Sequence, residues 1–170
     1  MDRLAVHDDF DRVAAAFRVL LDGATDDELR RRSSGTRWSN RQLLFHMLLV
    51  FLIMRALLAL ARIVAWLPDW FGRGWAKLLN AATKPFDAVN FVGSWVGGGV
   101  MPRKAMVVLC DHTVAAMHRR LDHESESGLA KGMPYPTRWD PFFREFMTVA
   151  DLYRLPVQHF DFHRDQLSLS

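Results

Sequence analysis

The chain of 170 residues carries 22 lysines and arginines against 19 aspartates and glutamates, for a formal net charge of +3. Half of the residues are hydrophobic and 12% are aromatic, which excludes an intrinsically disordered protein. The length suits one well-buried core and is too short for two ordinary domains, so we expect a single domain over residues 1–170.

The distribution of charge and the single cysteine indicate which kinds of partner and which cellular compartment to expect. The only tight basic run, the three arginines at 30–32, follows three acidic residues at 26–28 and is interpreted as a solvated helix end. No nucleic-acid motif is present, so no nucleic-acid partner is expected. The single cysteine, Cys110, has no partner for an internal disulfide, and the opening MDRLAVHDDFDR does not resemble a signal peptide. A cytoplasmic protein is expected.

Capping patterns and apolar spacing predict the first helices. Residues 8–22 place Phe10, Val13 and Phe17 at helical spacing before Gly23, which is typical of an amphipathic helix with a glycine stop. Residues 25–28 (TDDE) and 39–42 (SNRQ) both fit capping boxes. The second box opens a long helix predicted from about residue 40 to Leu67, where Pro68 ends it.

This long helix is apolar enough for a transmembrane span to be considered. Arg55 and Arg62 would fall inside any window of about 20 residues that crosses a bilayer. Each would cost about 2.5–3.5 kcal/mol near the bilayer centre. At about 100° per residue both lie roughly opposite His46. The pattern therefore predicts a helix with a solvent-facing arginine stripe and His46 turned inward.

Residues 69–95 are rich in tryptophan and predict one or two short helices broken around Pro85, followed by a loop over GSWVGGGVMP at 93–102. We interpret this segment as a cover over the mouth of a helical bundle. The alternative is a membrane-surface helix through residues 66–80, because indoles and cations favour the interface.

The second half of the chain predicts two more helices and no strand. One runs from beyond Pro102 to about Leu121, and residues 123–139 then form a polar loop rich in Gly and Pro. Residues 139–147 are expected to be a short helix or irregular. The last helix is predicted to open at Pro156, a residue suited to a first helical turn. Because no alternating Val/Ile/Thr runs occur, the fold class is predicted as all-α.

Three histidines form a candidate metal site. His159 and His163 are four residues apart, so on a helix their rings share one face. His46 lies on the inward face of the long apolar helix. The plainer interpretation is a surface pair plus a core histidine satisfied by one hydrogen bond. Three imidazoles from two packed helices would instead bind one cation and leave coordination positions open, which is typical of catalytic rather than structural sites.

Other polar residues are assigned lesser roles. Gln166 and Asp151 are candidates to hold the second ring nitrogen of a ligand histidine, although either could simply be solvated. Cys110 is interpreted as a buried, inert thiol because its neighbours are apolar. The remaining histidines are interpreted as surface or cap residues: His7, His112, His118 and His123.

The pattern GTRWSNRQLLFHM, with a tryptophan before a capping box and an inward histidine, resembles the opening of DinB/YfiT-like family proteins, and QHFDFHRDQL resembles their C-terminal helix. The resemblance covers the chain in order, with residues 66–101 longer and more aromatic than the usual connection. It implies an up-down-down-up four-helix bundle, to which the longer segment here adds a Trp-rich helical insertion between helices 2 and 3. It also implies that His46, His159 and His163 bind one divalent metal, either zinc, nickel, iron or manganese.

The same resemblance implies a class of function. Relatives include enzymes that use the thiols mycothiol, bacillithiol or glutathione, and dimers are common. We expect a metal-dependent enzyme that activates a low-molecular-weight thiol or water for attack on a small electrophilic substrate. The alternatives are a non-catalytic, stress-related bundle that binds a metal or an apolar ligand, and attachment to a membrane surface through residues 66–80.

Overall fold

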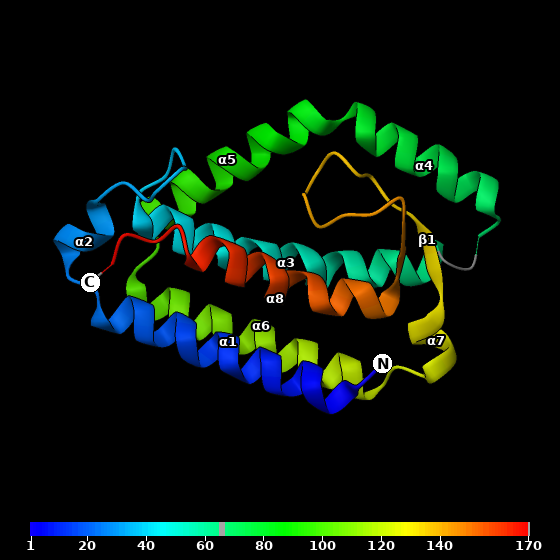
Figure 1. The fold of residues 1–170 in the computed structure, drawn as a ribbon, viewed down its shortest axis with the longest axis horizontal. Coiled ribbons are helices and arrows are strands. Elements are labelled where there is room, and N and C mark those ends of the chain that lie inside the picture. The colour runs from blue at the N-terminus through cyan, green and yellow to red at the C-terminus, as the bar shows by residue number, and fades with distance from the viewer. Residues whose placement is uncertain (65–66, 170) are drawn as a thin grey trace.

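The computed structural model describes residues 1–64 and 67–169, which are mostly helical (Figure 1). Its helices are α1 (Arg3–Gly23), α2 (Asp26–Arg30), α3 (Asn40–Val64), α4 (Asp69–Ala81), α5 (Thr83–Val100), α6 (Arg103–Asp122), α7 (Glu126–Ala130) and α8 (Val149–Arg164). Two strands, β1 (Gly132–Pro134) and β2 (Phe146–Thr148), pair in antiparallel fashion. Trp66, at the start of the expected insertion, lies outside the described residues, and Leu67 lies in a bend rather than in the long helix.

Four helices, α1, α3, α6 and α8, enclose the core. Following the colours in Figure 1, α1 and α8 run in one direction while α3 and α6 run in the other, which is the expected up-down-down-up order. Each helix contributes fully buried side chains, among them Phe10 and Phe17 from α1, Phe51 from α3, Met117 from α6 and Phe160 from α8. The all-α prediction is confirmed, although the two short strands were not expected.

Side-chain caps set where the site-bearing helices begin. At the start of α3, Gln42 N donates to Ser39 Oγ (3.3 Å) and Ser39 N donates to Gln42 Oε1 (3.0 Å), as the sequence predicted. Thr148 caps α8 in the same way. The prediction that the last helix opens at Pro156 is therefore wrong: α8 begins about two turns earlier, at Val149. Pro156 lies inside it, where its missing N–H removes one hydrogen bond from a helix that is otherwise well buried.

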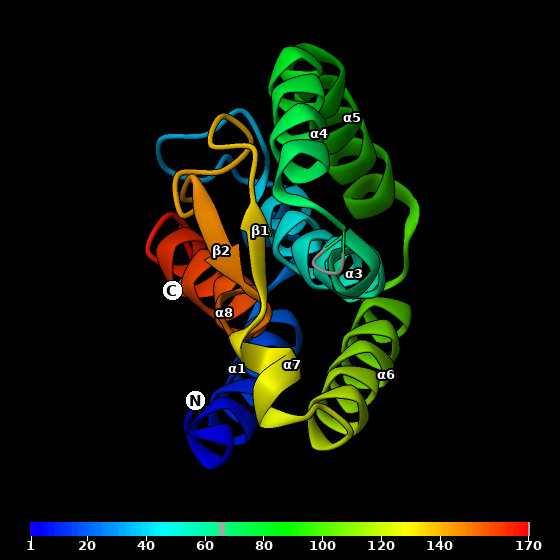
Figure 2. The same cartoon turned by 90° about the vertical axis from the view of Figure 1, so that its right-hand side faces the viewer.

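Helices α4 and α5 follow one another in a bent line (Figure 1), which Figure 2 shows end-on; α5 packs along the outer side of α3, and α4 contacts β1. They meet at Ala82, so the break precedes Pro85, which lies in the first turn of α5. The expected loop at 93–102 is also wrong, because α5 continues to Val100. Its glycines serve close packing: a Cβ on Gly98 would lie 2.6 Å from Gln42 Cα of α3.

This close approach predicts opposite effects for two neighbouring glycines. Gly98→Ala must push α5 away from the α3 backbone, so we expect a loss of about 1–3 kcal/mol in the free energy of unfolding. Gly99→Ala is the matched control, because a Cβ at Gly99 has no neighbour within 4 Å. There, alanine should be neutral or stabilise the helix by up to about 1 kcal/mol. Urea unfolding of both variants measures the difference, and equal effects would contradict the packing argument.

Helix α3 is the central element of the molecule. Among the described residues it is the one helix long and apolar enough to cross a membrane, with a mean hydropathy of 2.5 over an 18-residue window within Asn40–Ile63. In this structure 56% of that apolar window is buried inside the protein. Arg55 is exposed, as the predicted stripe requires, and Arg62 reaches Glu124 at 2.5 Å. The length and composition of α3 are therefore as compatible with a helix buried in a protein core as with a membrane span.

Candidate metal centre

His46 lies in the second turn of α3 and faces the core with an exposed fraction of 2%. The indole of Trp38 stacks on its ring with centroids 4.4 Å apart, and Phe91 of α5 stacks in turn on Trp38 with centroids 5.9 Å apart. These aromatic contacts fix the plane of the imidazole. The ring is therefore held in one orientation toward α8.

His159 and His163 meet His46 from the facing helix α8. They lie one helical turn apart, with exposed fractions of 5% and 9%. Their ring centroids are 4.4 Å from each other and each is 4.9 Å from that of His46. The Nε2 atoms of His46 and His159 are 3.0 Å apart, and one ring nitrogen from each histidine lies within 4.8 Å of the others. The three histidines are thus close enough to hold one metal ion.

The second nitrogen of each ring has its own hydrogen-bond partner. His159 Nδ1 lies 2.8 Å from Asp140 Oδ2, and His163 Nδ1 lies 2.6 Å from Gln166 Oε1. A carboxylate oxygen and an amide oxygen only accept hydrogen bonds, so both Nδ1 atoms carry the proton. The partner of the third ring, that of His46, is the Ser94 hydroxyl of α5.

The Ser94 hydroxyl gives His46 the same tautomer as the other two histidines. Ser94 Oγ donates to the carbonyl oxygen of Asn90 (2.7 Å), so toward His46 Nδ1 (3.2 Å) it accepts. In neutral imidazoles this tautomer leaves all three Nε2 atoms unprotonated, with lone pairs that can face one cation. Three acceptors converging without a donor are unfavourable unless a cation binds between them. Ring N–H groups held by oxygen acceptors are the usual arrangement around metal-binding histidines. The donor set therefore fits a divalent transition metal.

Burial also favours the neutral form of His46 and His163. The pKa of His46 is well below its usual value because of burial first and the neighbouring His159 and His163 second. The pKa of His163 falls to about 4, mainly through burial and then through His159, with Gln166 and Asp140 opposing the shift. Both rings thus stay neutral at pH 7, and neutral imidazole is the form that binds metals.

A model of the DinB superfamily matches residues 9–167 of the chain. The chain belongs to the DinB superfamily. Searches against curated proteins and against solved structures found no match. The match spans every helix that positions the three histidines, and the expectation that rested on the two short motifs is confirmed at the level of the family.

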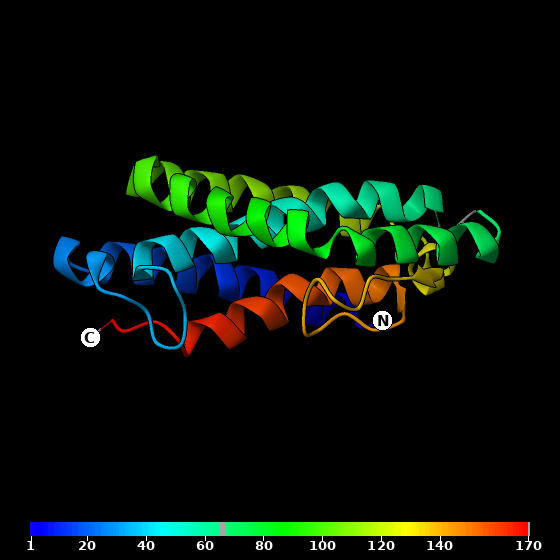
Figure 3. The same ribbon diagram turned by 90° about the horizontal axis from the view of Figure 1, so that it is seen from above.

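In this DinB-superfamily chain, Gln166 reaches His163 because two distant segments meet. The loop after α2 and the residues after α8 lie side by side, as the view from above shows (Figure 3). Ser34 N donates to the carbonyl oxygen of Gln166 (2.8 Å), and Ser168 N donates to Asn40 Oδ1 (3.0 Å). Gly35, with a positive φ of 68°, makes the turn that allows this approach. Gln166 is thus placed where a partner for a ligand's ring nitrogen was expected.

The expectation for Asp151 needs correction. Its carboxylate completes the capping box of α8 with Thr148 and forms an ion pair with Arg144 at 2.7 Å. The carboxylate beside the histidines is Asp140, which comes from the irregular segment between β1 and β2. Sequence patterns did not single it out, because a loop residue has no periodicity that assigns it to a face. Ser94 was overlooked because its helix was taken for a loop.

A pocket of about 290 Å³ opens to solvent beside His163, the one of the three histidines that lines it. Its walls include the aromatic rings of Trp38 and Phe91, and of its lining residues Arg37 alone carries a full charge. The lining is completed by Gly35, Thr36, His163 and Gln166. Such a volume suits a small molecule that combines an apolar part with an anionic group.

Cys110 takes no part in this site. It is buried in α6, and burial, with a smaller effect of Asp111, raises the pKa of its thiol to about 12. At pH 8 the thiol is therefore neutral and unreactive. We expect Ellman's reagent to leave the folded protein unlabelled and to label one thiol per chain after unfolding in denaturant. Rapid labelling of the native protein would contradict this placement.

Proposed function

We propose that His46, His159 and His163 bind one divalent transition metal and that the protein is a metal-dependent enzyme acting on a small electrophile. The observation that carries the proposal is the convergence of three buried histidines, each with its Nδ1 beside an oxygen atom, next to an open pocket. A divalent cation bound by neutral imidazoles lowers the pKa of a coordinated thiol or water and so supplies a nucleophile near neutral pH.

The pocket residues support a low-molecular-weight thiol as the nucleophile. No carboxylate is found among the residues that line the pocket, so the lining offers no carboxylate base to remove a proton from the nucleophile. A thiol held at the three histidines does not need one, because the nearby positive charge stabilises its anion. Arg37 lies at the pocket where it can bind a carboxylate of the cosubstrate or substrate, while Trp38 and Phe91 exclude water from one wall.

Turnover by metal-loaded protein tests this function. We would incubate the protein, reconstituted in turn with zinc, nickel, iron or manganese, with glutathione, a sugar-containing thiol or water and a panel of small electrophiles. We expect conjugation or hydrolysis at least tenfold above that of His159→Ala, with His112→Ala as the control because His112 is exposed on α6. A metal-loaded protein that binds thiol but never turns over would support the non-catalytic alternative instead.

A membrane surface is the second candidate partner, favoured by the exposed face of α4. Trp70 and Leu78 are 68% and 59% exposed, with Arg73 and Lys77 beside them on the same helix. Cosedimentation with anionic phospholipid vesicles tests it: binding that is lost in Trp70→Ser/Leu78→Ser would support it. Equal recovery of wild type and variant in the supernatant would exclude it. Residue 66 of the proposed segment lies outside the described residues.

A further inference from the structure

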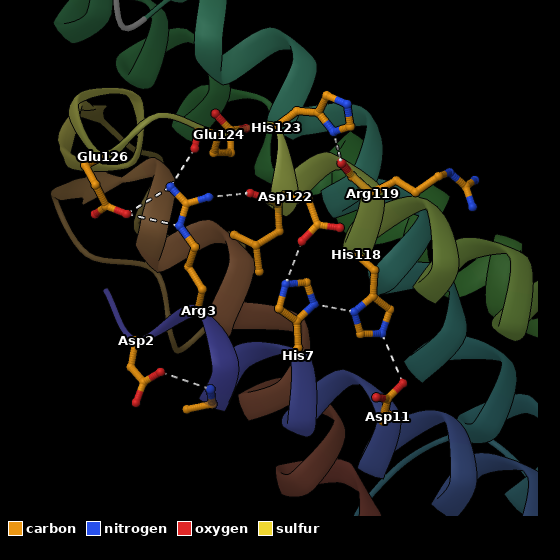
Figure 4. Close-up of polar contacts among 12 residues, drawn as sticks. Asp2, Arg3, His7, Asp11, His118, Arg119, Asp122, His123, Glu124 and Glu126 are labelled. Atoms are coloured by element: carbon orange, nitrogen blue, oxygen red, sulfur yellow. Dashed lines mark hydrogen bonds and ion pairs between the residues drawn. The ribbon is translucent and has the colours of Figure 1, made fainter.

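A second histidine cluster lies between α1 and α6, away from the three histidines. His7 and Asp11 are four residues apart on α1, and His118 and Asp122 are four residues apart on α6. Residues at this spacing share a helix face, so each helix presents one imidazole and one carboxylate to the other. Figure 4 shows the two rings pointing at each other, with an aspartate on the far side of each. His7 and His118 were expected to be surface or cap residues, which this pairing corrects.

The cluster is cross-paired between the helices. His7 Nε2 lies 3.0 Å from Asp122 Oδ1, and His118 Nε2 lies 3.1 Å from Asp11 Oδ1. A carboxylate only accepts hydrogen bonds, so both Nε2 atoms carry a proton. In neutral imidazoles this tautomer leaves each Nδ1 with an exposed lone pair.

The two lone pairs point directly at each other. The Nδ1 atoms are 2.5 Å apart, the ring centroids are 4.8 Å apart, and the ring planes are parallel within 4°. The centroid separation exceeds the Nδ1–Nδ1 distance by about the width of one imidazole ring. Two parallel rings with this relation lie edge to edge, with their nitrogens between the two centroids, rather than face to face. Two nitrogen acceptors in this arrangement repel each other unless a cation lies between them.

We propose that His7 and His118 bind a second divalent transition metal through their Nδ1 atoms, while Asp11 and Asp122 hold the rings in the binding tautomer. Imidazoles whose other ring nitrogen donates to a carboxylate are the common form of metal-binding histidine. The +2 charge of a divalent cation also neutralises the negative charges of both aspartates, whereas the charge of one shared proton neutralises only one of them. The site is independent of the one formed by His46, His159 and His163.

The surroundings allow such a cation to enter. The side chains of His7 and His118 are 23% and 21% exposed, so water can complete the coordination. Metal–nitrogen bonds of about 2.0–2.1 Å need the nitrogens further apart than they are, and partly exposed side chains can rotate to make that room. Arg3, on the same helix as His7, instead pairs with Glu126 and donates to the carbonyl oxygens of Leu121 and Glu124. Phe10 packs edge-on against His118 and supports one side of the ring.

Equilibrium dialysis against zinc measures the number of sites. We expect two zinc ions per chain for wild type and for the control His112→Asn, and one for His118→Asn or His7→Gln. In a His159→Ala/His163→Ala background one zinc should remain and should be lost on adding His118→Asn. Zinc content in this background reports on the second site alone, so an error in the second assignment can be told apart from an error in the first. Equal zinc content in wild type and His118→Asn would overturn the proposal.

Nitrogen NMR of the histidine rings tests the ligands without relying on a variant that folds. Adding zinc to wild type should shift the Nδ1 resonances of His7 and His118 and leave those of His112 and His123 unchanged. If the Nδ1 resonances of the pair respond only to pH and not to zinc, the bridging cation is a proton and the proposed metal site is wrong.

Discussion

Asp140→Asn is expected to weaken metal binding at the His46, His159 and His163 site by about 10–100-fold. Asp140 Oδ2 lies 2.8 Å from His159 Nδ1, and the carboxylate side chain is only 10% exposed. Its negative charge fixes the tautomer that turns Nε2 of His159 toward the other rings, and it increases the basicity of that nitrogen. The amide keeps the size of the side chain but removes the charge, and it can present its NH₂ group to the ring.

Metal affinity can be measured by competition with a chromophoric chelator. Asp165→Asn is the matched control, because Asp165 is exposed at the C-terminal end of α8 and its replacement changes the net charge by the same amount. We expect the control to bind the metal as wild type does. Equal affinities for Asp140→Asn and the control would mean that the carboxylate does not support the site.

Arg62→Met is expected to lower the free energy of unfolding by about 3 kcal/mol. Glu124 has a side chain only 4% exposed and accepts hydrogen bonds from Arg62 (2.5 Å) and from the hydroxyl of Tyr153 (2.9 Å). Removing the guanidinium leaves a buried carboxylate without its countercharge, which is the costly way to break a buried pair. We expect the lower end of the usual range because the side chain of Arg62 is itself 38% exposed.

Urea unfolding of the metal-free protein at pH 7 isolates this contribution from metal binding. Arg55→Met is the control, since Arg55 is an exposed arginine on the same helix and about the same face. We expect it to change the free energy of unfolding by no more than about 0.5 kcal/mol. If the two variants are equally stable, the ion pair with Glu124 contributes nothing and the arginine stripe is only a solvated surface.

The three histidines could be anticipated from the sequence because each lies on a helix whose face is set by its neighbours. The arginines at 55 and 62 assigned the inward side of α3, and a spacing of four placed His159 and His163 on one face. Capping boxes fixed the starts of α2 and α3 for the same local reason. Local hydrogen bonds of this kind depend only on residues within one turn.

The parts that sequence patterns did not reveal depend on contacts between distant segments. The run of glycines in α5 was interpreted as a loop, whereas it allows the α5 backbone to pack directly on α3 and thereby brings Ser94 to His46. Asp140 reaches His159 from an irregular segment whose path is set by β1, β2 and α4. His7 and His118 were assigned separately to a chain end and a helix surface, because nothing in the sequence shows that α1 and α6 pack side by side.

Metal content of the purified protein tests the central claim most directly. Mass spectrometry would be applied to wild type and to His159→Ala/His163→Ala after reconstitution and extensive dialysis, which should remove ions from weaker sites. We predict that the variant retains one transition metal fewer per chain than wild type, with both proteins equally helical by circular dichroism. A wild type that remains metal-free after reconstitution would contradict the ligand assignment and leave a helical bundle that recognises its ligand by shape alone.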